Sequence, residues 1–391
     1  MIVTPLSGRA TAVRDALLSH GWEGDLARLT AGGLDVAAFH ITQIPAGLAE
    51  AMLPLAARLG LELVTGDDWL ILRGARSRLG AFARPWMQPE PVRDLATAIG
   101  MSLPGENDHR WRHARGTVAV EGAVIVGVIN VTPDSFSDGA PTISMDEALR
   151  RTDELLAGGA TLIDVGGEST RPGAEPVTVE IEQRRILAVL AAVAGRHPSL
   201  PLSVDTVHAS TAEAAIGAGA AIINDVTAGR HDPALLGVAA RHRAGVVLAH
   251  SRGPLGRLAS YDRADYDGDV SSTVARELRA AIETAIAAGI APDAIVVDPG
   301  FGFGKTAPQS LALLDQLDAI VALGHPVLVG VSRKRFLGEA TGQPVEDRDR
   351  ATAAACALAF ERGARLFRVH APAAVRDALA VAQAVRGTGL E

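Results

Sequence analysis

The chain has 391 residues, of which 48% are hydrophobic and 21% are charged, and this composition excludes an intrinsically disordered protein. Its net charge of -8 argues against nucleic acid or an anionic membrane as a partner. Cys356 is the single cysteine, which excludes an intramolecular disulfide framework and favours a reducing, cytoplasmic location. We expect no membrane span, because no apolar run reaches about 18 residues.

Residues 1–105 are predicted to form a small α+β domain of unknown role. Its predicted elements are, in order, a helix near 10–19, a strand at 34–41, a helix at 46–59, a hairpin of 61–65 and 69–72 around Gly66-Asp67-Asp68, and helices near 76–84 and 92–99. His109 and His113 have the i,i+4 spacing of metal ligands on a helix, but such a pair without a third ligand is more often a surface feature.

Residues 106–391 are predicted to form an α/β domain, a (β/α)8 TIM barrel, because strand and helix patterns alternate eight times over roughly 260 residues. A doubly wound open sheet is the alternative. The predicted strands lie near 124–129, 161–165, 201–204, 221–224, 246–249, 294–297, 326–331 and 365–369. The helical patterns lie near 145–158, 179–194, 209–218, 233–243, 270–288, 308–323, 349–362 and 372–385. A hairpin of 117–120 with the start of the first core strand is expected before the barrel.

Each predicted barrel strand is followed by a polar or ionisable residue at its carboxyl end. These residues are Asn130, Asp164, Asp205, Asn224 with Asp225, His250, Asp298, Ser332-Arg333-Lys334, and Arg368 with His370. The carboxyl ends of barrel strands form the catalytic face, and so many buried polar groups are costly to desolvate without a ligand. The sequence therefore predicts an active site at this face.

The residue types at this face suggest two kinds of ligand. Arg171, Arg368 and His370 supply cations and donors that suit phosphate oxygens. Asn130 supplies a hard carbonyl oxygen, and Mg²⁺ takes few such protein ligands and keeps phosphates and waters for the rest. A mix of acceptors, an amide and a donor suits a flat heterocycle with amino, N–H and carbonyl groups, and is supplied by Asp205, Asn224, Asp298 and Lys334. We expect Asp225 to orient loop backbone.

The stretch Gly300 to Thr306 is close to a phosphate-binding loop, but Pro299 stands where the first glycine is needed. We expect its glycines to bring backbone close to a flat ligand instead. Ser251 beside His250 is not expected to form a nucleophile–base pair, because adjacent strand residues point to opposite faces.

Several segments together resemble the dihydropteroate synthase family. They are 130–139 (NVTPDSFSDG), 164–173 (DVGGESTRPG), 203–206 (SVDT), 223–225 (IND), 298–305 (DPGFGFGK), 332–336 (SRKRF) and 368–370 (RVH). The resemblance runs from about residue 117 to the end, so residues 1–105 have no counterpart in the minimal family enzyme. Two positions depart from the family pattern: Leu248-Ala249-His250-Ser251 lacks the usual methionines, and Ala140 stands where a second glycine is common.

The resemblance implies an enzyme of folate synthesis, a transferase that joins 6-hydroxymethyl-7,8-dihydropterin pyrophosphate to 4-aminobenzoate and is a sulfonamide target. It implies Mg²⁺ as cofactor, held by Asn130, and a homodimer. The implied catalytic residues are Asp205, Lys334, Asp134 and Arg171. The implied substrate-binding residues are Thr170, Arg171, Pro172, Asp205, Asn224, Asp298, Phe303, Lys334, Arg368, His370 and Phe136.

Two alternative functions share parts of this pattern. Methyltransferases that pass a methyl group from methyltetrahydrofolate to a corrinoid share the barrel and the pterin pocket, but have no need of the first loop or of Ser169-Thr170-Arg171-Pro172. A non-catalytic pterin-binding paralogue predicts lost loop or phosphate residues, and none is missing here.

Overall fold

The computed structural model describes residues 1–6, 16–17, 19–20, 36–75, 78–79, 82–83, 89–102, 110–131, 144–168, 177–266 and 269–387. The chain divides into two compact units, Met1–Asn107 with Asp318–Gly324, and Asp108–Leu317 with His325–Glu391. The predicted boundary between residues 105 and 106 lies in the segment 103–109, outside the described residues. None of the described helices is long and apolar enough to cross a membrane.

The first unit contains a four-stranded antiparallel sheet in the order β1-β2-β4-β3. Its elements are β1 (Ile2–Leu6), β2 (Val36–Thr42), α3 (Leu48–Leu59), β3 (Glu62–Thr65), β4 (Trp69–Ala75) and α5 (Glu90–Ser102). Side chains alternate across the pleat, so the two faces of β2 and β4 serve different clusters. Phe39 and Leu72 pack with α3 and α5, whereas Ala38 and Ile71 pack on the other side with Trp69. The unit therefore has a core of its own.

The predictions for this unit are largely confirmed. The predicted strand at 34–41 forms as β2, the predicted helix at 46–59 forms as α3, and the hairpin around Gly66 forms as β3 and β4. Helix α5 is longer than the predicted 92–99. β1 was not predicted. The predicted helices near 10–19 and 76–84 lie largely outside the described residues, although short helical stretches at 16–17 and 78–79 fall within them.

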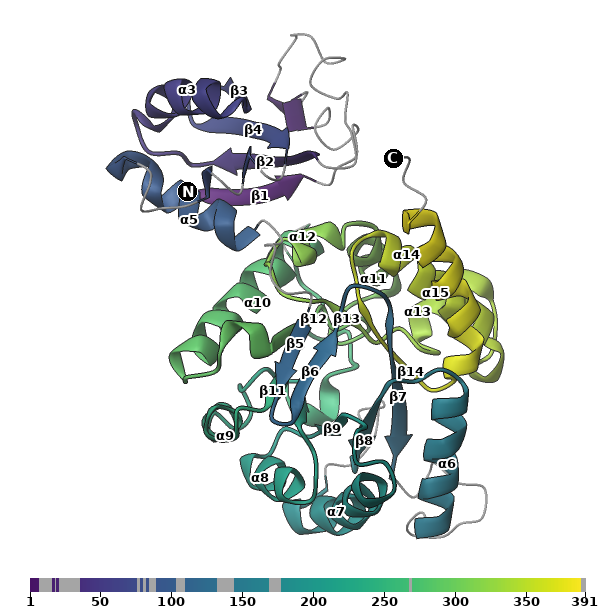
Figure 1. The fold of residues 1–391 in the computed structure, drawn as a ribbon. Helices are drawn as coiled ribbons and strands as arrows, with labels where there is room; N and C mark the ends of the chain where they lie inside the picture. The colour runs from purple at the N-terminus through teal and green to yellow at the C-terminus, as the bar shows by residue number, and fades with distance from the viewer. Residues whose placement is uncertain are drawn as a thin grey trace. The chain divides into compact units, whose positions relative to one another are not determined.

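The second unit is built on an eight-stranded parallel sheet in the order β12-β11-β10-β9-β8-β7-β14-β13 within the described residues. A parallel bridge between Val297 and Val327 joins β12 to the chain just before β13, which closes the sheet into a barrel (Figure 1). The strands are β7 (Val124–Asn130), β8 (Leu162–Gly166), β9 (Leu202–Asp205), β10 (Ile222–Asp225), β11 (Gly245–Ala249), β12 (Ile295–Asp298), β13 (Leu328–Val329) and β14 (Leu366–Val369). The predicted TIM barrel is confirmed, and the open sheet is not.

Helices surround the barrel and separate successive strands (Figure 1). Their bounds are α6 (Met145–Ala157), α7 (Val179–Arg196), α8 (Ala209–Gly217), α9 (Ala234–His242), α10 (Val270–Ala287), α11 (Ala307–Asp315), α12 (Asp318–Val321), α13 (Arg335–Thr341), α14 (Asp349–Glu361) and α15 (Pro372–Gly387). Side-chain caps fix several starts: Ser144, Thr178 and Asp269 each accept a hydrogen bond from a backbone N–H of the first turn. Thr306 and Gln309 form a capping box at α11.

Two sequence predictions for this unit were wrong in detail, and one disfavoured alternative, a metal site of His109 and His113, is excluded. The residues Gly116–Ala119 (β6) pair with Arg110–His113 (β5), not with the first barrel strand. His113 is therefore on a strand, where Trp111 and His113 point inward by alternation, and a two-histidine metal site on a helix is ruled out. The helix predicted over 308–323 is broken at Gln316, which leaves helical angles, and it resumes as α12.

The β5–β6 hairpin closes the amino end of the barrel. The Trp111 side chain is 1% exposed and packs with residues near the start of the barrel strands, among them Val124, Leu162 and Leu366. Its indole N–H donates to the carbonyl oxygen of Ala294, just before β12, at 2.9 Å. A buried indole needs such a partner, so this bond fixes the ring in place. The amino end of the barrel is consequently filled by side chains, and the polar groups lie at its carboxyl end.

Candidate active site

Four polar side chains from separate strands form one chain of contacts at the carboxyl end of the barrel. The Asn224 amide nitrogen donates to Asp164 Oδ2 at 3.1 Å, and Arg368 Nε donates to the same oxygen at 2.6 Å. Arg368 Nη2 donates to Asp205 Oδ2 at 2.7 Å. Asp164 is 1% exposed, and its Oδ1 has no hydrogen-bond partner among the described residues. A buried carboxylate oxygen without a donor is costly, which favours a ligand that supplies one.

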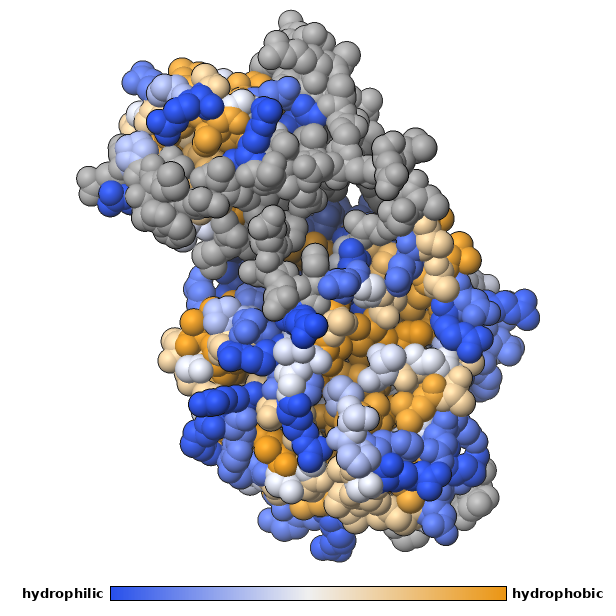
Figure 2. Space-filling model, in the orientation of Figure 1, coloured by the Kyte–Doolittle hydropathy of each residue, from blue (hydrophilic) through white to orange (hydrophobic). Residues whose placement is uncertain are grey.

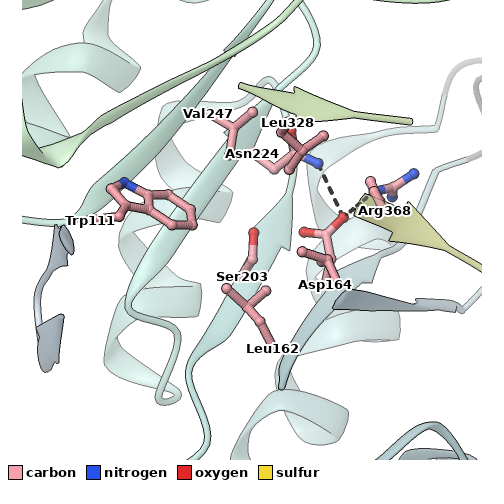
Figure 3. A pocket seen from close by; sticks show the side chains of 9 residues that line it. Trp111, Leu162, Asp164, Ser203, Asn224, Val247, Leu328 and Arg368 are labelled. Atoms are coloured by element: carbon pink, nitrogen blue, oxygen red, sulfur yellow. Dashed lines mark hydrogen bonds and ion pairs between the residues drawn. The ribbon is translucent and has the colours of Figure 1, made fainter. Parts of the chain in front are cut away.

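A small cavity runs from these groups into the barrel (Figure 3). Asp164, Ser203 and Asn224 face it, while Trp111 borders it from the closed end. The strands hold these side chains rigidly because their backbones are bonded on both sides. The register pairs Asp164 with Ser203 and Asn224 with Asp205, so the inward-facing groups lie at matching levels.

Burial shifts the pKa of the ionisable groups at this end of the barrel. Desolvation raises the pKa of Asp205 to about 7, although the nearby Arg368 guanidinium opposes the rise. Desolvation also raises the pKa of Asp298, against the nearby Lys334 ammonium. The pKa of Lys334 falls to about 8 because its charged form is buried. Two groups thus titrate near neutral pH, as acid–base and charge-stabilising residues in active sites commonly do.

Lys334 connects α13 to the loop after β12. Its ammonium donates to the carbonyl oxygen of Phe301 and lies 4.2 Å from the centre of the Phe303 ring. Phe303 packs near Val207 and Leu258. Asp298 Oδ1 accepts a hydrogen bond from Gly300 N at 2.7 Å, which turns the chain after the strand. A flat hydrophobic ring and a cation therefore lie beside the carboxylates.

Strained backbone precedes Lys334. Arg333 has φ of 56°, a left-handed conformation that a non-glycine residue adopts at a cost. Its guanidinium is bonded to both oxygens of Asp349 at 2.7 and 2.8 Å, and its N–H donates to Thr352 Oγ1 at 3.1 Å. These contacts hold the strained residue and so direct Lys334 toward Phe301. The sequence placed Arg333 at a strand end but carried no signal for its conformation.

The remaining predicted site residues lie at the same end or outside the described residues. The His370 imidazole Nδ1 lies 3.1 Å from Ser332 Oγ, and half-buried Asn130 ends β7 opposite Gly166. Asp225 accepts bonds from Thr227 and Gly229, so it orders its own loop as predicted. The residues outside the described range are Asp134, Phe136, Thr170, Arg171 and Pro172.

The comparisons with known proteins agree with this geometry. The family model described as pterin binding enzyme matches residues 126–370, the barrel that carries the polar strand ends. The dihydropteroate synthase of Bacillus subtilis (strain 168) is 40% identical over 250 residues, which are 64% of this chain and 84% of that enzyme.

The chain belongs to the dihydropteroate synthase family.

Solved structures of dihydropteroate synthases show the same fold. The Xanthomonas albilineans enzyme with 4-aminobenzoic acid is 42% identical, with a TM-score of 0.67 over 72% of this chain and 100% of that one. The same enzyme in complex with 7,8-dihydropteroate is 41% identical, with a TM-score of 0.64 over 71% of this chain and 99% of that one. The family model begins at residue 126, after residues 1–107 of the first unit.

Proposed function

We propose that the barrel joins the methylene carbon of 6-hydroxymethyl-7,8-dihydropterin pyrophosphate to the amino nitrogen of 4-aminobenzoate, releasing pyrophosphate and 7,8-dihydropteroate. The observation that carries this proposal is the linked set of Asn224, Asp164, Arg368 and Asp205 beside Asp298 and Lys334. Solved relatives with 4-aminobenzoic acid and with 7,8-dihydropteroate support the choice of substrates.

The pterin half of the site is formed by Asp205, Asn224, Asp298 and Lys334. A reduced pterin presents an amino group, ring N–H groups and a carbonyl, and these side chains supply the complementary acceptors and donors. Asp164 fixes the Asn224 amide, so that its oxygen is left to accept from the ligand. Arg368 has a second task beside the phosphate group: its Nε and Nη2 donate to Asp164 and Asp205, so it also orients these two carboxylates.

The aminobenzoate half is formed by Phe303 and Lys334, together with Thr170, Pro172 and Phe136, which lie outside the described residues. The Phe303 ring offers a flat surface for the benzene ring, and the Lys334 ammonium attracts its carboxylate. Lys334 therefore faces both halves of the site, which places the two reacting atoms near each other.

In this proposal pyrophosphate is bound by His370, Arg368 and Arg171, and Asn130 would hold Mg²⁺. Within the described part of the chain no group of three or more His, Cys, Asp or Glu could hold a metal ion. A single amide oxygen at the end of β7 nevertheless fits Mg²⁺, which commonly takes its other ligands from phosphate and water. The ion supplies positive charge to the leaving group.

The carbon–oxygen bond of the pterin methylene breaks with both electrons leaving on pyrophosphate. The resulting pterin cation is stabilised by the carboxylates of half-buried Asp205 and buried Asp298, because opposite charge is worth most where water is excluded. Attack by the amino nitrogen on this cation forms the new carbon–nitrogen bond, and the nitrogen then gives one proton to water or to the released pyrophosphate. Asp134, Asp205, Lys334 and Arg171 are the residues assigned to catalysis.

The decisive experiment measures pyrophosphate release by the purified full chain. We expect release that depends on both substrates and on Mg²⁺, and formation of 7,8-dihydropteroate in equal amount. Full activity after exhaustive chelation would remove the metal from the proposal. Absence of product with both substrates would favour a non-catalytic pterin-binding protein, and methyl transfer to a corrinoid would favour the methyltransferase alternative.

We also propose a homodimer formed through α14 and α15. Leu358 is 49% exposed, and Val381 and Val385 are 64% and 60% exposed on the neighbouring helix. Figure 2 shows hydrophobic surface over this part of the barrel unit. Such a patch favours a second copy of the chain, which sedimentation analysis tests.

A cytoplasmic location is supported by the single, buried Cys356.

A further inference from the structure

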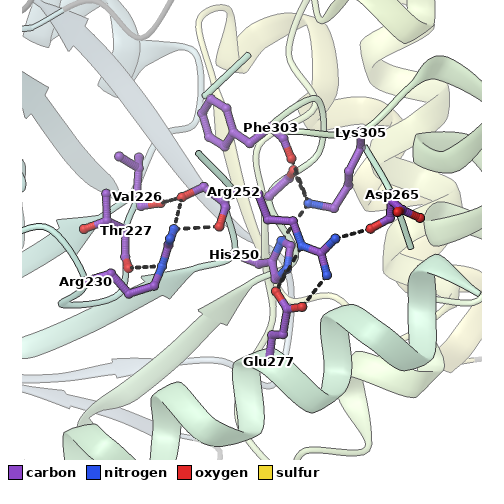
Figure 4. A network of polar contacts seen from close by, with 11 residues as sticks. Val226, Thr227, Arg230, His250, Arg252, Asp265, Glu277, Phe303 and Lys305 are labelled. Atoms are coloured by element: carbon purple, nitrogen blue, oxygen red, sulfur yellow. Dashed lines mark hydrogen bonds and ion pairs between the residues drawn. The ribbon is translucent and has the colours of Figure 1, made fainter. Parts of the chain in front are cut away.

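The lysine of the near-phosphate loop has no role in the function described above. Lys305 follows the glycine-rich stretch after β12, and its side chain is 1% exposed. In a phosphate loop this lysine would reach out to the ligand. Here it turns back into its own loop (Figure 4).

The Lys305 ammonium has three hydrogen-bond acceptors around it. These are His250 Nδ1 at 2.9 Å, the carbonyl oxygen of Gly300 at 3.0 Å and the carbonyl oxygen of Phe303 at 3.1 Å. The ammonium form has three N–H donors, so all three find acceptors inside the protein, which together with the nearby Asp298 opposes the lowering of the Lys305 pKa by desolvation. Two of the three acceptors belong to the loop itself, which closes it at both ends.

His250 extends this contact to the surface helix α10. Burial beside Lys305 lowers the pKa of His250 to about 3, so its ring is neutral at neutral pH. Nδ1 accepts from Lys305, and therefore Nε2 carries the proton and donates to Glu277 Oε2 at 2.8 Å. Glu277 is also paired with Arg252, whose guanidinium lies 4.1 Å from the Tyr266 ring centre. Figure 4 shows the chain running from Lys305 through His250 to Glu277.

The loop held in this way carries the aminobenzoate side of the site. Phe303 presents its ring to Lys334, and the carbonyl oxygen of Phe301 accepts from the same ammonium. Gly300 has φ of 67°, and a Cβ there would lie 1.8 Å from the His250 carbonyl oxygen. The loop thus touches the histidine through backbone as well as through Lys305, and a shift of one is passed to the other.

We propose that Lys305, oriented by His250 and Glu277, is a positioning residue for 4-aminobenzoate: it fixes the loop that sets the Phe303 ring and the Phe301 carbonyl against Lys334. It touches no substrate. This inference rests on the proposed assignment of Phe303 and Lys334 to the aminobenzoate half.

The test compares the KM for 4-aminobenzoate in full-length Lys305→Met and Glu277→Gln enzymes at saturating dihydropterin pyrophosphate. Methionine fills the same space but leaves both loop carbonyls without a donor. We expect Lys305→Met to raise this KM about tenfold, the scale of one charged hydrogen bond. Glu277→Gln keeps the shape and removes the charge that orients His250, so we expect a rise of about threefold. The KM for dihydropterin pyrophosphate should rise less in both variants.

A rise in the KM for 4-aminobenzoate that exceeds the rise in the KM for dihydropterin pyrophosphate distinguishes a positioning role from loss of stability. An enzyme that is merely less stable has fewer active molecules, which lowers the apparent kcat and leaves KM unchanged. Glu213→Gln is the matched control, because Glu213 also bridges an arginine and a histidine, Arg241 and His242, but does so on the outer helices. Its KM should equal that of the unchanged enzyme. If Lys305→Met does not fold, Glu277→Gln decides alone, since its side chain is 37% exposed.

A Phe303→Leu variant distinguishes the two ways of being wrong. If it leaves the KM for 4-aminobenzoate unchanged, the assignment of the aminobenzoate half is wrong. If it raises this KM while Glu277→Gln and any folded Lys305→Met do not, the assignment stands and the positioning role of Lys305 is refuted. An equal rise in the KM of both substrates, or a rise in Glu213→Gln, also refutes that role.

Discussion

The site places carboxylates beside cations, and the carboxylates can stabilise a substrate that becomes positively charged. Asp164, Asp205 and Asp298 are buried or nearly so, and the cations beside them are Arg368 and Lys334. When all five are ionised they carry a net charge of about -1, and the Lys305 ammonium, which donates to carbonyls of its own loop, is a further cation near Asp298. The carboxylates of the pocket stabilise a substrate that becomes positive as its leaving group departs.

Replacing Asp205 with asparagine tests this at one position. The amide keeps the shape of the side chain and removes its charge, so we expect roughly a 10²-fold or greater loss of kcat, the scale for one preorganised electrostatic group. Circular dichroism should show an unchanged fold. Asp153→Asn, which removes a surface partner of Arg196, should keep full activity. Near-normal turnover in a folded Asp205→Asn enzyme would refute the assignment.

The pKa values of the site predict a narrow pH optimum. Asp205, with a pKa of about 7, must lose its proton to stabilise positive charge, so kcat/KM for dihydropterin pyrophosphate should rise with pH through about 7. Lys334, with a pKa of about 8, must keep its proton, so activity should fall above about 8. Lys334→Arg keeps its charge to higher pH and should lose the alkaline fall. A profile without a fall below about pH 7 would contradict the role of Asp205, and one without a fall above about pH 8 would contradict the role of Lys334.

At the scale of elements, the strands were predictable and the loops between them were not. A strand buried on both faces is a continuous apolar run, which is why Val124 to Asn130 and its counterparts were recognised in order. The partner of a strand is a tertiary property, so residues 117–120 were wrongly predicted to pair with the first barrel strand, whereas β6 pairs with β5. The ends of strands predicted which polar residues meet. They could not predict that Arg368 lies between two aspartates or that Lys305 turns inward, because both depend on side-chain geometry.

Gly300 and Gly195 give opposite predictions for the same substitution. Gly300 needs a left-handed backbone and has no room for a Cβ, so Gly300→Ala should destabilise the protein by at least about 2 kcal/mol and lower activity. Gly195 lies in α7 with nothing within 4 Å of an added Cβ. Gly195→Ala should stabilise by about 0.5–1 kcal/mol, because alanine loses less entropy in a helix. Urea unfolding of both variants measures the difference, and equal effects would contradict the argument.

At the scale of the whole molecule, the barrel carries all the described site residues and the first unit carries a separate core. The segment Asp318–Gly324 is grouped with the first unit although it lies within the barrel sequence. The sequence did not predict this grouping, because residues 308–323 have an uninterrupted helical pattern that indicated one barrel helix.

We expect a chain shortened to residues 106–391 to fold and to keep measurable synthase activity. It retains the β5–β6 hairpin, every barrel strand and every assigned site residue. The segment Asp318–Gly324 is grouped with the first unit and loses its neighbours there, so lower stability or solubility is expected. Steady-state kinetics with circular dichroism measures this. A well-folded shortened chain without activity would show that the first unit contributes to the site.

Sulfonamides should inhibit this enzyme in competition with 4-aminobenzoate. They share its aniline ring, and Phe303 and Lys334 offer the ring contact and the cation. Inhibition constants measured at rising 4-aminobenzoate concentrations provide the check. Inhibition that is insensitive to 4-aminobenzoate would mean that its pocket has been misplaced.

The Trp111 indole closes the amino end of the barrel. Because the amino end is plugged by a side chain that is itself bonded to Ala294, both substrates and both products must pass through the carboxyl face. Asn224 and Asp164, assigned to the pterin half of the site, line the same cavity as Trp111, so we expect the pterin to bind deeper in the barrel than the aminobenzoate. We therefore expect ordered binding: the pterin substrate binds first, and an aminobenzoate analogue that binds before it prevents its entry.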